Sequence, residues 1–81
     1  MRVHVELYAQ LRELAGLSTM QVDLPDRATV AELIEQICQL KPALGAHDKN
    51  ILVGVGVDFV QRDHVLSEDE EIAIMPPVQG G

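Results

Sequence analysis

One helix-length segment in the middle of this chain constrains its fold more than any other part. Thr29 and Glu32 have the spacing of a capping box, in which each side chain accepts a hydrogen bond from the other residue's backbone N–H at a helix start. Pro42 sets the limit at the other end. Between them, apolar residues recur at spacings of three and four: Val30, Leu33, Ile34, Ile37 and Cys38. A single helix with one apolar stripe must bury that stripe against another element, and a β-sheet is the predicted partner.

Alternating apolar and polar residues predict strands on both sides of this helix. Residues 2–8 place Val3, Val5 and Leu7 on one face, and residues 19–24 repeat the pattern. These two segments are predicted to pair antiparallel. Further strands are predicted at 51–57, 59–60 and 71–75.

The segments between the predicted strands and the main helix also have recognisable sequence patterns. Residues 9–15 are predicted to form a short helix with Leu11, Leu14 and Ala15 facing inward and Gly16 as its C-terminal cap. The polar residues 43–50 predict a surface loop. Gly54 and Gly56 indicate a bulge, or the close approach of another backbone, in the strand at 51–57. Cys38 lies on the apolar stripe, so we expect a buried, unreactive thiol there.

This order of elements predicts an α+β fold with a mixed sheet packed on one main helix. The first and last strands can lie parallel in the middle of the sheet, because the helix between them provides the crossover that parallel pairing needs. This is the β-grasp arrangement of ubiquitin. With 81 residues there is room for one domain, predicted at 1–75, followed by an extended tail at 76–81.

The charge of the chain limits its partners. Thirteen acidic and six basic residues give a net charge of −7, which phosphate backbones and anionic lipids would repel. We therefore expect neither nucleic acid nor membrane as a partner, and a basic docking surface is favoured as strongly as a simple role in solubility. No apolar run has the length of a signal peptide or membrane span, so a cytoplasmic location is predicted.

No catalytic or metal-binding pattern is visible in the chain. His4, His47 and His64 are far apart in sequence, and a single cysteine cannot complete a structural zinc site. The acidic run 68–71 is typical of a solvated turn. The sequence therefore predicts no bound metal and no bound cofactor.

The last six residues have a different character from the body. Pro76 and Pro77 fix φ near −65° and favour an extended stalk. Gly80 and Gly81 lack Cβ, so a partner can close around their backbone and leave the terminal carboxylate to react. Ordering a residue costs about 1–2 kcal/mol, and a stiff stalk lowers that cost when the tail enters a narrow channel.

Residues 8–16 (YAQLRELAG) and 75–81 (MPPVQGG) resemble the small, sulfur-carrier subunits of molybdopterin synthases. The resemblance implies a ubiquitin-like fold and a heterotetramer with a large subunit that holds the catalytic residues. It implies that an E1-like enzyme consumes ATP to adenylate Gly81, and that a sulfur donor protein then allows its conversion to a thiocarboxylate. That group would give its sulfur to cyclic pyranopterin monophosphate inside the large subunit.

The same resemblance assigns roles to residues near the tail. Pro76, Pro77, Val78, Gln79 and Gly80 would thread into the partner. Ala73 and Met75 alternate with Ile72 and Ile74, so they are candidates for an exposed apolar docking patch, although Met75 could equally complete the edge of the core. Arg12 is a further candidate for partner binding. Two alternatives stay open: a sulfur carrier for the thiazole of thiamine, and a modifier that joins Gly81 to lysine.

Overall fold

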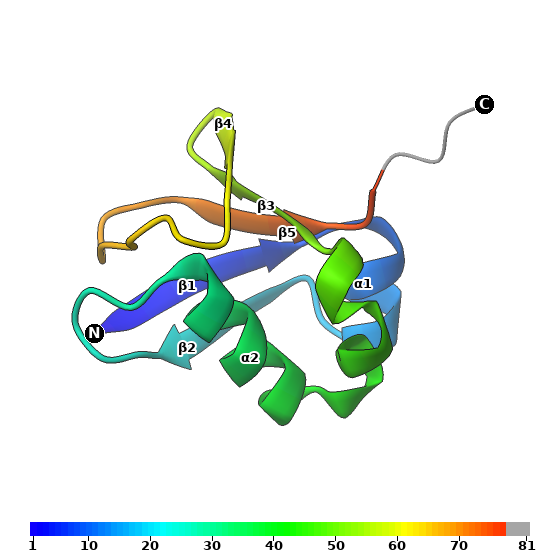
Figure 1. Ribbon diagram of the computed structural model, residues 1–81. Helices are drawn as coiled ribbons and strands as arrows, with labels where there is room; N and C mark the ends of the chain where they lie inside the picture. Colours follow the sequence, from blue (N-terminus) through cyan, green and yellow to red (C-terminus); the bar gives the residue numbers. More distant parts are fainter. Residues whose placement is uncertain (78–81) are drawn as a thin grey trace.

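The computed structural model describes residues 1–77 (Figure 1). Its helical elements are α1 (Ala9–Ala15), α2 (Val30–Leu40) and the 3-10 helix η1 (Pro42–Asn50). Its strands are β1 (Arg2–Leu7), β2 (Thr19–Asp23), β3 (Leu52–Val55), β4 (Asp58–Val60) and β5 (Ile72–Met75). The predicted order of strands and helices is confirmed, with boundaries shifted by one or two residues.

The five strands form one mixed sheet in the order β2-β1-β5-β3-β4. β1 and β5 are parallel and lie side by side, whereas the other neighbouring strands are antiparallel. Figure 1 shows α2 lying across one face of this sheet. The predicted β-grasp fold is confirmed, including the parallel pairing of the first and last strands.

α2 begins as its sequence predicts. The Thr29 hydroxyl accepts a hydrogen bond from the Glu32 N–H at 3.3 Å, and a Glu32 carboxylate oxygen accepts one from the Thr29 N–H at 3.2 Å. The helix buries four residues of its apolar stripe against the sheet: Val30, Leu33, Ile34 and Ile37. The fifth, Cys38, is only half-buried, so the prediction of a buried thiol was wrong. Cys38 packs against the core but also lines an open hollow, which leaves part of its side chain exposed.

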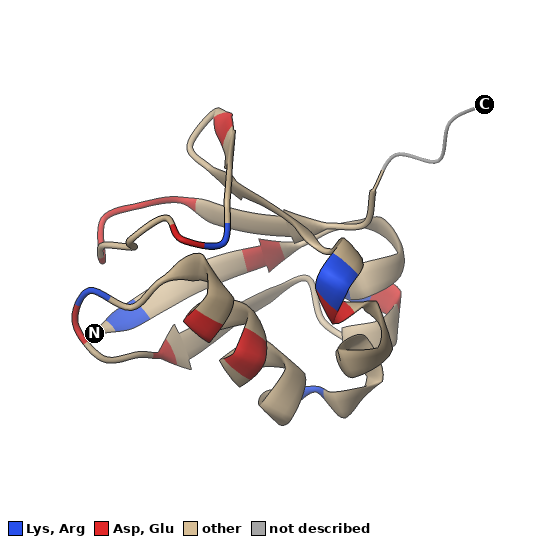
Figure 2. Cartoon of the chain, viewed as in Figure 1, with Lys and Arg blue, Asp and Glu red and all other residues tan. Residues whose placement is uncertain are grey.

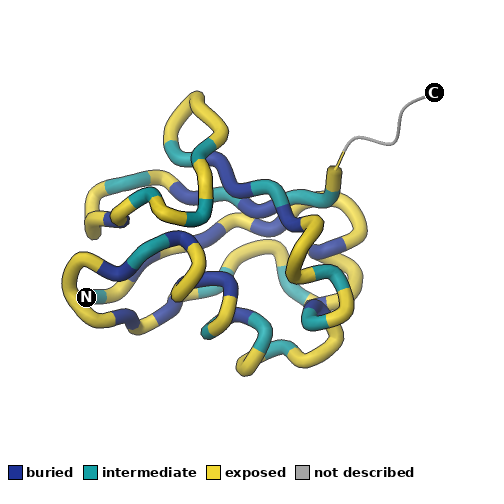
Figure 3. The backbone as a smooth tube through the Cα atoms, viewed as in Figure 1, coloured by how far each residue is buried: buried dark blue, intermediate teal, exposed yellow. Residues whose placement is uncertain are grey.

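The core is aliphatic and follows the alternation of the strands (Figure 3). β1 buries Val3, Val5 and Leu7, and β5 buries Ile72 and Ile74, all on the face that α2 covers. The intervening residues point to the opposite side of the sheet, which we call the open face. One face of the sheet is therefore left for contacts outside the chain.

The short connections contain two differences from prediction. In α1, Leu11 and Ala15 are buried as expected, and Gly16 adopts φ of +77° at the C-cap, but Leu14 is exposed. Residues 43–50, predicted as a loop, belong to η1, which begins at Pro42 and contains the fully buried Leu44. A single anchoring leucine in a polar segment is too weak a pattern for a helix to be predicted from it.

The two glycines near β3 have separate roles. Gly56 adopts φ of +63° in the two-residue turn between β3 and β4, a conformation that disfavours side chains. Gly54 lies within β3, and a Cβ there would meet only the Asp58 carbonyl oxygen at 3.7 Å. The predicted bulge or close backbone approach is therefore not what keeps residue 54 small.

A carboxylate closes the turn before β5. Glu70 accepts hydrogen bonds from the Ser67 N–H at 2.6 Å and the Ser67 hydroxyl at 3.2 Å, and its other oxygen lies 3.1 Å from His64 Nε2. Burial opposes ionisation of Glu70, but the hydrogen bonds with His64 and Ser67 outweigh it and lower its pKa. The His64 carbonyl also accepts from the Val30 N–H at 2.9 Å, so this turn is linked to the start of α2.

We expect a pH-dependent contribution of Glu70 to stability. Because its pKa is lower in the folded chain, the contribution is complete above the ordinary value of 4.5 and disappears as the pH falls through the folded value. Glu70→Gln should reduce the free energy of unfolding by about 1 kcal/mol near neutral pH and leave it unchanged in strong acid. Urea unfolding over a range of pH measures this difference. Glu68→Gln, in the same turn, is the control and should leave the free energy of unfolding near neutral pH almost unchanged.

Candidate functional site

β5 carries the chain toward its C-terminus through the middle of the sheet. Ile72 and Ile74 are buried, whereas Ala73 and Met75 are half-buried on the open face. The alternation predicted for this strand is therefore confirmed. What Ala73 and Met75 bind stays a prediction.

Strand register surrounds these two residues with other apolar groups. Leu52 lies beside Met75, Gly54 beside Ala73, and Phe59 beside Gly54. Phe59 is 67% exposed, although it is the only phenylalanine in the chain. We call this group the apolar surface: Leu52, Gly54, Phe59, Ala73 and Met75. Sequence reasoning missed Leu52, Gly54 and Phe59, because their meeting with β5 depends on pairings between distant segments.

The apolar surface contains a shallow hollow of about 100 Å³. Residues of three neighbouring strands and of the hairpin turn line it: Ala73 and Met75 of β5, Gly54 of β3, Asp58 and Phe59 of β4, and Gly56 of the turn. The fully exposed Val57 stands at its edge, at the tip of the hairpin between β3 and β4. Small residues in the middle and large ones around them give the surface a concave shape.

The base of the tail lies against a second, smaller group of residues. Pro76 and Pro77 line a hollow of about 130 Å³ together with the start of α1 and the end of η1. Gln10 and Leu11 come from α1, and His47 comes from η1. The tail therefore starts from a position that two helical elements and a strand define together (Figure 1).

Several predicted residues lie elsewhere or beyond the described chain. Val78, Gln79, Gly80 and Gly81 fall outside the described residues, so their predicted roles are untested. Arg12 is exposed on α1 and lines neither the hollow of the apolar surface nor the one at Pro76. The structure does not bring it into the apolar surface.

A polar seam borders the apolar surface on the open face. Glu6 lies beside Ala73 across the β1–β5 pair, and the Tyr8 hydroxyl donates a hydrogen bond to the Glu6 carboxylate. That hydrogen bond, together with the negative charges of Glu6 and Glu71, raises the pKa of Tyr8. Glu6 belongs to β1, and Glu71 directly precedes the neighbouring β5, so carboxylates occur on both sides of this strand pair.

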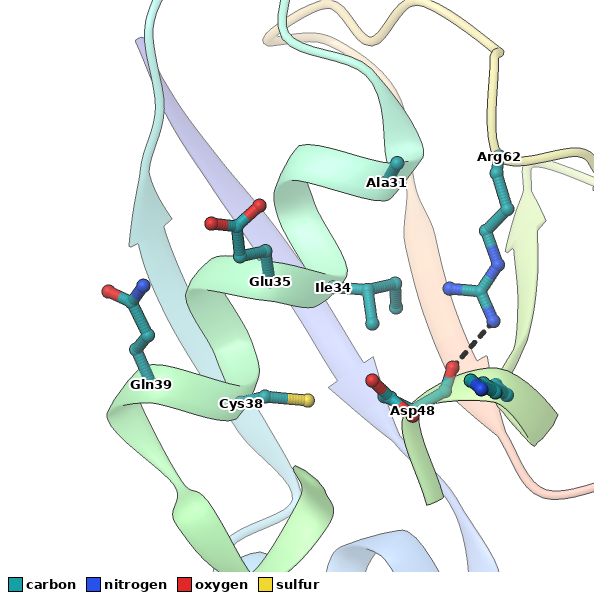
Figure 4. Close-up of a pocket in the computed structure, with 8 residues that line it drawn as sticks. Ala31, Ile34, Glu35, Cys38, Gln39, Asp48 and Arg62 are labelled. Atoms are coloured by element: carbon teal, nitrogen blue, oxygen red, sulfur yellow. Dashed lines mark hydrogen bonds between the residues drawn. The ribbon is translucent and has the colours of Figure 1, made fainter. Parts of the chain in front are cut away.

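A third hollow, of about 640 Å³, lies on the helical side of the molecule (Figure 4). Its lining includes Cys38 from α2 and Asp48 from η1, with Arg62 opposite, whose guanidinium donates to the Asp48 carbonyl oxygen at 2.7 Å. Burial first, and then the Asp48 charge, raise the pKa of Cys38. This thiol is therefore protonated at neutral pH and is a poor nucleophile.

The described residues contain neither a candidate metal site nor a candidate membrane span. Within residues 1–77, no three His, Cys, Asp or Glu side chains gather as they would around a metal ion. In the same range, no helix is both long enough and apolar enough to cross a membrane. The candidate functional site is the apolar surface together with the base of the tail, which contain the predicted residues Ala73, Met75, Pro76 and Pro77.

Comparison with known proteins shows the family of this chain. A model of the ThiS family matches residues 5–81. The molybdopterin synthase sulfur carrier subunit of Escherichia coli K12 is 35% identical over 81 residues, covering 98% of this chain and 99% of its own length. The corresponding subunit of Chlamydomonas reinhardtii is 32% identical over 83 residues and is matched over the whole of both chains.

A solved structure supports the fold. The crystal structure of Haloferax volcanii small archaeal modifier protein 1 superimposes with a TM-score of 0.85 at 27% identity, covering 95% of this chain and 98% of the other. Since the family model covers almost the entire chain, this protein belongs to the ThiS family, and among its relatives it is similar to molybdopterin synthase sulfur carrier subunits.

Proposed function

We propose that this chain is a sulfur carrier that delivers sulfur as a thiocarboxylate on Gly81 for molybdenum cofactor biosynthesis. The observation that carries the proposal is the full-length similarity to sulfur carrier subunits of molybdopterin synthase. The family match runs to residue 81 and so includes the two terminal glycines. The receiving compound is cyclic pyranopterin monophosphate, which gains the sulfur atoms of a dithiolene.

The chemistry of the terminus explains why other proteins are required. A carboxylate is a poor electrophile, so an E1-like enzyme first converts it into an acyl adenylate at the expense of ATP. Sulfur from a donor protein then replaces oxygen, and the product is an anionic nucleophile at neutral pH. A residue without Cβ at position 81 leaves the carbonyl open to attack. All these steps take place in the cytoplasm, where the activating enzyme has ATP.

The large subunit of molybdopterin synthase is the partner in the second half of the cycle. Among residues 1–77 this chain offers no metal cluster, and its one cysteine has a raised pKa. The large subunit therefore supplies the acids, bases and cations, and this chain supplies the reagent. The apolar surface docks on the large subunit, and the tail beyond Pro77 enters its active site.

Intact mass spectrometry tests the proposal. The chain is coexpressed with the E1-like enzyme and a sulfur donor, then purified and weighed. A mass increase equal to the replacement of one oxygen by sulfur, located at Gly81 by fragmentation, supports a carrier. Formation of molybdopterin from cyclic pyranopterin monophosphate after adding the large subunit then separates this carrier from one that serves the thiazole of thiamine.

A second candidate function is protein modification. It is favoured by the similarity to Haloferax volcanii small archaeal modifier protein 1, which is 27% identical. In that case Gly81 would form an isopeptide bond with a lysine of a target protein. Covalent conjugates that appear without any thiocarboxylate would support the modifier and contradict the carrier.

Docking through the apolar surface gives a direct prediction. Met75→Glu places a charge on this surface beside Leu52, and we expect the affinity for the large subunit to fall by about tenfold or more. The fold should survive, because Met75 lies outside the buried core. Isothermal titration calorimetry measures the change. Leu40→Glu puts the same charge on an exposed apolar residue of α2 and should leave the affinity unchanged; equal losses in both variants would contradict the assignment.

A further inference from the structure

The open face of the sheet is divided into two halves of different chemistry. Strand register aligns one residue from each strand in a row across it: Thr19, Glu6, Ala73, Gly54 and Phe59. The half on β2 and β1 is polar, and the half on β5, β3 and β4 is apolar. The boundary runs between β1 and β5, where Glu6 faces Ala73.

The hollow at Gly54 is the most specific feature of the apolar half. Neither the backbone angle nor the packing of the chain requires glycine there, since no positive φ occurs and an added Cβ would make only one ordinary contact. Glycine inside a strand weakens it relative to alanine. What the missing side chain does provide is depth in the hollow of about 100 Å³. This is somewhat less than the ~150 Å³ of an apolar cavity that holds benzene, so it suits one aliphatic side chain.

The polar boundary carries unpaired negative charge. Glu6 and Glu71 are both exposed, and Glu71 is next to the buried Ile72 and therefore points, like Ala73, to the open face. Among residues 1–77, neither carboxylate forms an ion pair with Lys or Arg. Figure 2 shows acidic residues at the end of β1 and along the segment leading into β5. A partner that covers the apolar surface meets these two charges at its edge.

We propose that the hollow at Gly54 receives a single aliphatic side chain projecting from the partner protein, and that a Lys or Arg beside that side chain pairs with Glu6 and Glu71. The inference rests on the proposed function and specifies the chemistry of the partner's docking surface. A second copy of this chain is the wrong occupant, because two copies meeting through this face would oppose carboxylate to carboxylate.

The hollow predicts opposite effects of one substitution on stability and on binding. Gly54→Ala should raise the midpoint of thermal unfolding, because the strand gains a residue with less conformational freedom in the unfolded chain. The same methyl group makes the hollow shallower, so affinity for the large subunit should fall by about threefold. Gly54→Leu fills the hollow with the chain's own side chain and should reduce affinity by about tenfold or more. If residue 54 had only a structural role, the thermal midpoint and the affinity for the large subunit would change in the same direction.

Calorimetric titration of the full chain with the large subunit measures both affinities. Gly45→Ala and Gly45→Leu are matched controls, because a Cβ at Gly45 meets nothing within 4 Å and this residue lies on η1, away from the hollow. They should leave the affinity unchanged. Circular dichroism and thermal melts establish that each variant is folded, and Gly54→Ala keeps the test valid if Gly54→Leu does not fold.

Charge is tested through the rate of association. Glu71→Gln should slow association with the large subunit about threefold at low salt, and the difference from the unmodified chain should vanish at high salt, where exposed charges are screened. Glu35→Gln removes the same charge from α2, where Glu35 lines the hollow on the helical side. This variant should leave the association rate unchanged. Surface plasmon resonance at two salt concentrations gives these rates.

Each outcome separates the inference from the proposed function. If the unmodified chain binds the large subunit and Gly54→Leu binds equally well, the inference is wrong and the proposed function stands. If the unmodified chain acquires no sulfur and binds no large subunit, the proposed function fails as well. Sedimentation velocity tests whether a second copy of this chain occupies the hollow instead. If the unmodified chain self-associates and Gly54→Leu abolishes this self-association, the hollow belongs to a second copy and the proposal is overturned.

Discussion

Deleting Gly81 should abolish the sulfur-transfer activity of the chain while leaving its folding unchanged. Removing one residue withdraws the reactive carbonyl by about 3.5 Å in an extended tail. A misplacement of only 1 Å in an active site can reduce a rate by about a hundredfold, so we expect at least that loss in molybdopterin formation. All helices and strands of the described chain lie within residues 2–75, so the thermal midpoint should stay the same.

Gly81→Val tests the second requirement at this position. It keeps the length of the tail but places a branched side chain next to the carbonyl carbon, and thiocarboxylate formation by the E1-like enzyme should be lost. Gly45→Val makes the same replacement in η1, where an added Cβ has free space, and should retain full activity. Intact mass and single-turnover formation of molybdopterin are the two measurements. Normal rates with the Gly81 deletion would refute the carrier proposal.

Replacing Ile74 with alanine should cause the largest loss of stability of any single truncation in β5. Ile74 is completely buried, and it lies between Leu7 of β1 and Val53 of β3. Truncating a buried isoleucine costs about 2–5 kcal/mol, because apolar area is lost and a cavity remains. A domain of this size has a total stability of about 4–12 kcal/mol, so much of it would disappear.

Urea unfolding followed by circular dichroism measures the effect of Ile74→Ala. The midpoint should move to lower urea concentration with an unchanged slope. Val57→Ala truncates an apolar residue that is 99% exposed and should change the free energy of unfolding by less than about 0.5 kcal/mol. Similar losses in the two variants would contradict the central position of β5 in the core.

Local patterns predicted most of the fold. The capping box at Thr29 and Glu32 joins residues three positions apart, so its hydrogen bonds are decided by neighbours in the sequence. The alternation in β1 and β5 likewise follows from the two-residue repeat of a strand. The parallel pairing of these strands was predictable because one helix supplies the only long crossover between them.

Contacts between distant segments were harder to predict from the sequence. Leu44 anchors η1 within a polar segment, and Cys38 of α2 is left half-buried. The contact of His64 with Glu70 joins two turns on either side of Leu66. None of these follows from periodicity, because each depends on how far the sheet and its connections extend around the helix.

The sequence by itself determined the strands, the two α-helices and their order, because capping and alternation are properties of residues and their immediate neighbours. The absence of Cβ at Gly80 and Gly81 likewise predicts an accessible terminus from the residues alone. Only the tertiary structure decided that Gly54 lies between Ala73 and Phe59 on the open face, with Glu6 at the boundary. Strand register sets these neighbours, and register is the joint result of core packing and turn geometry over the whole sheet, which no short stretch of sequence contains.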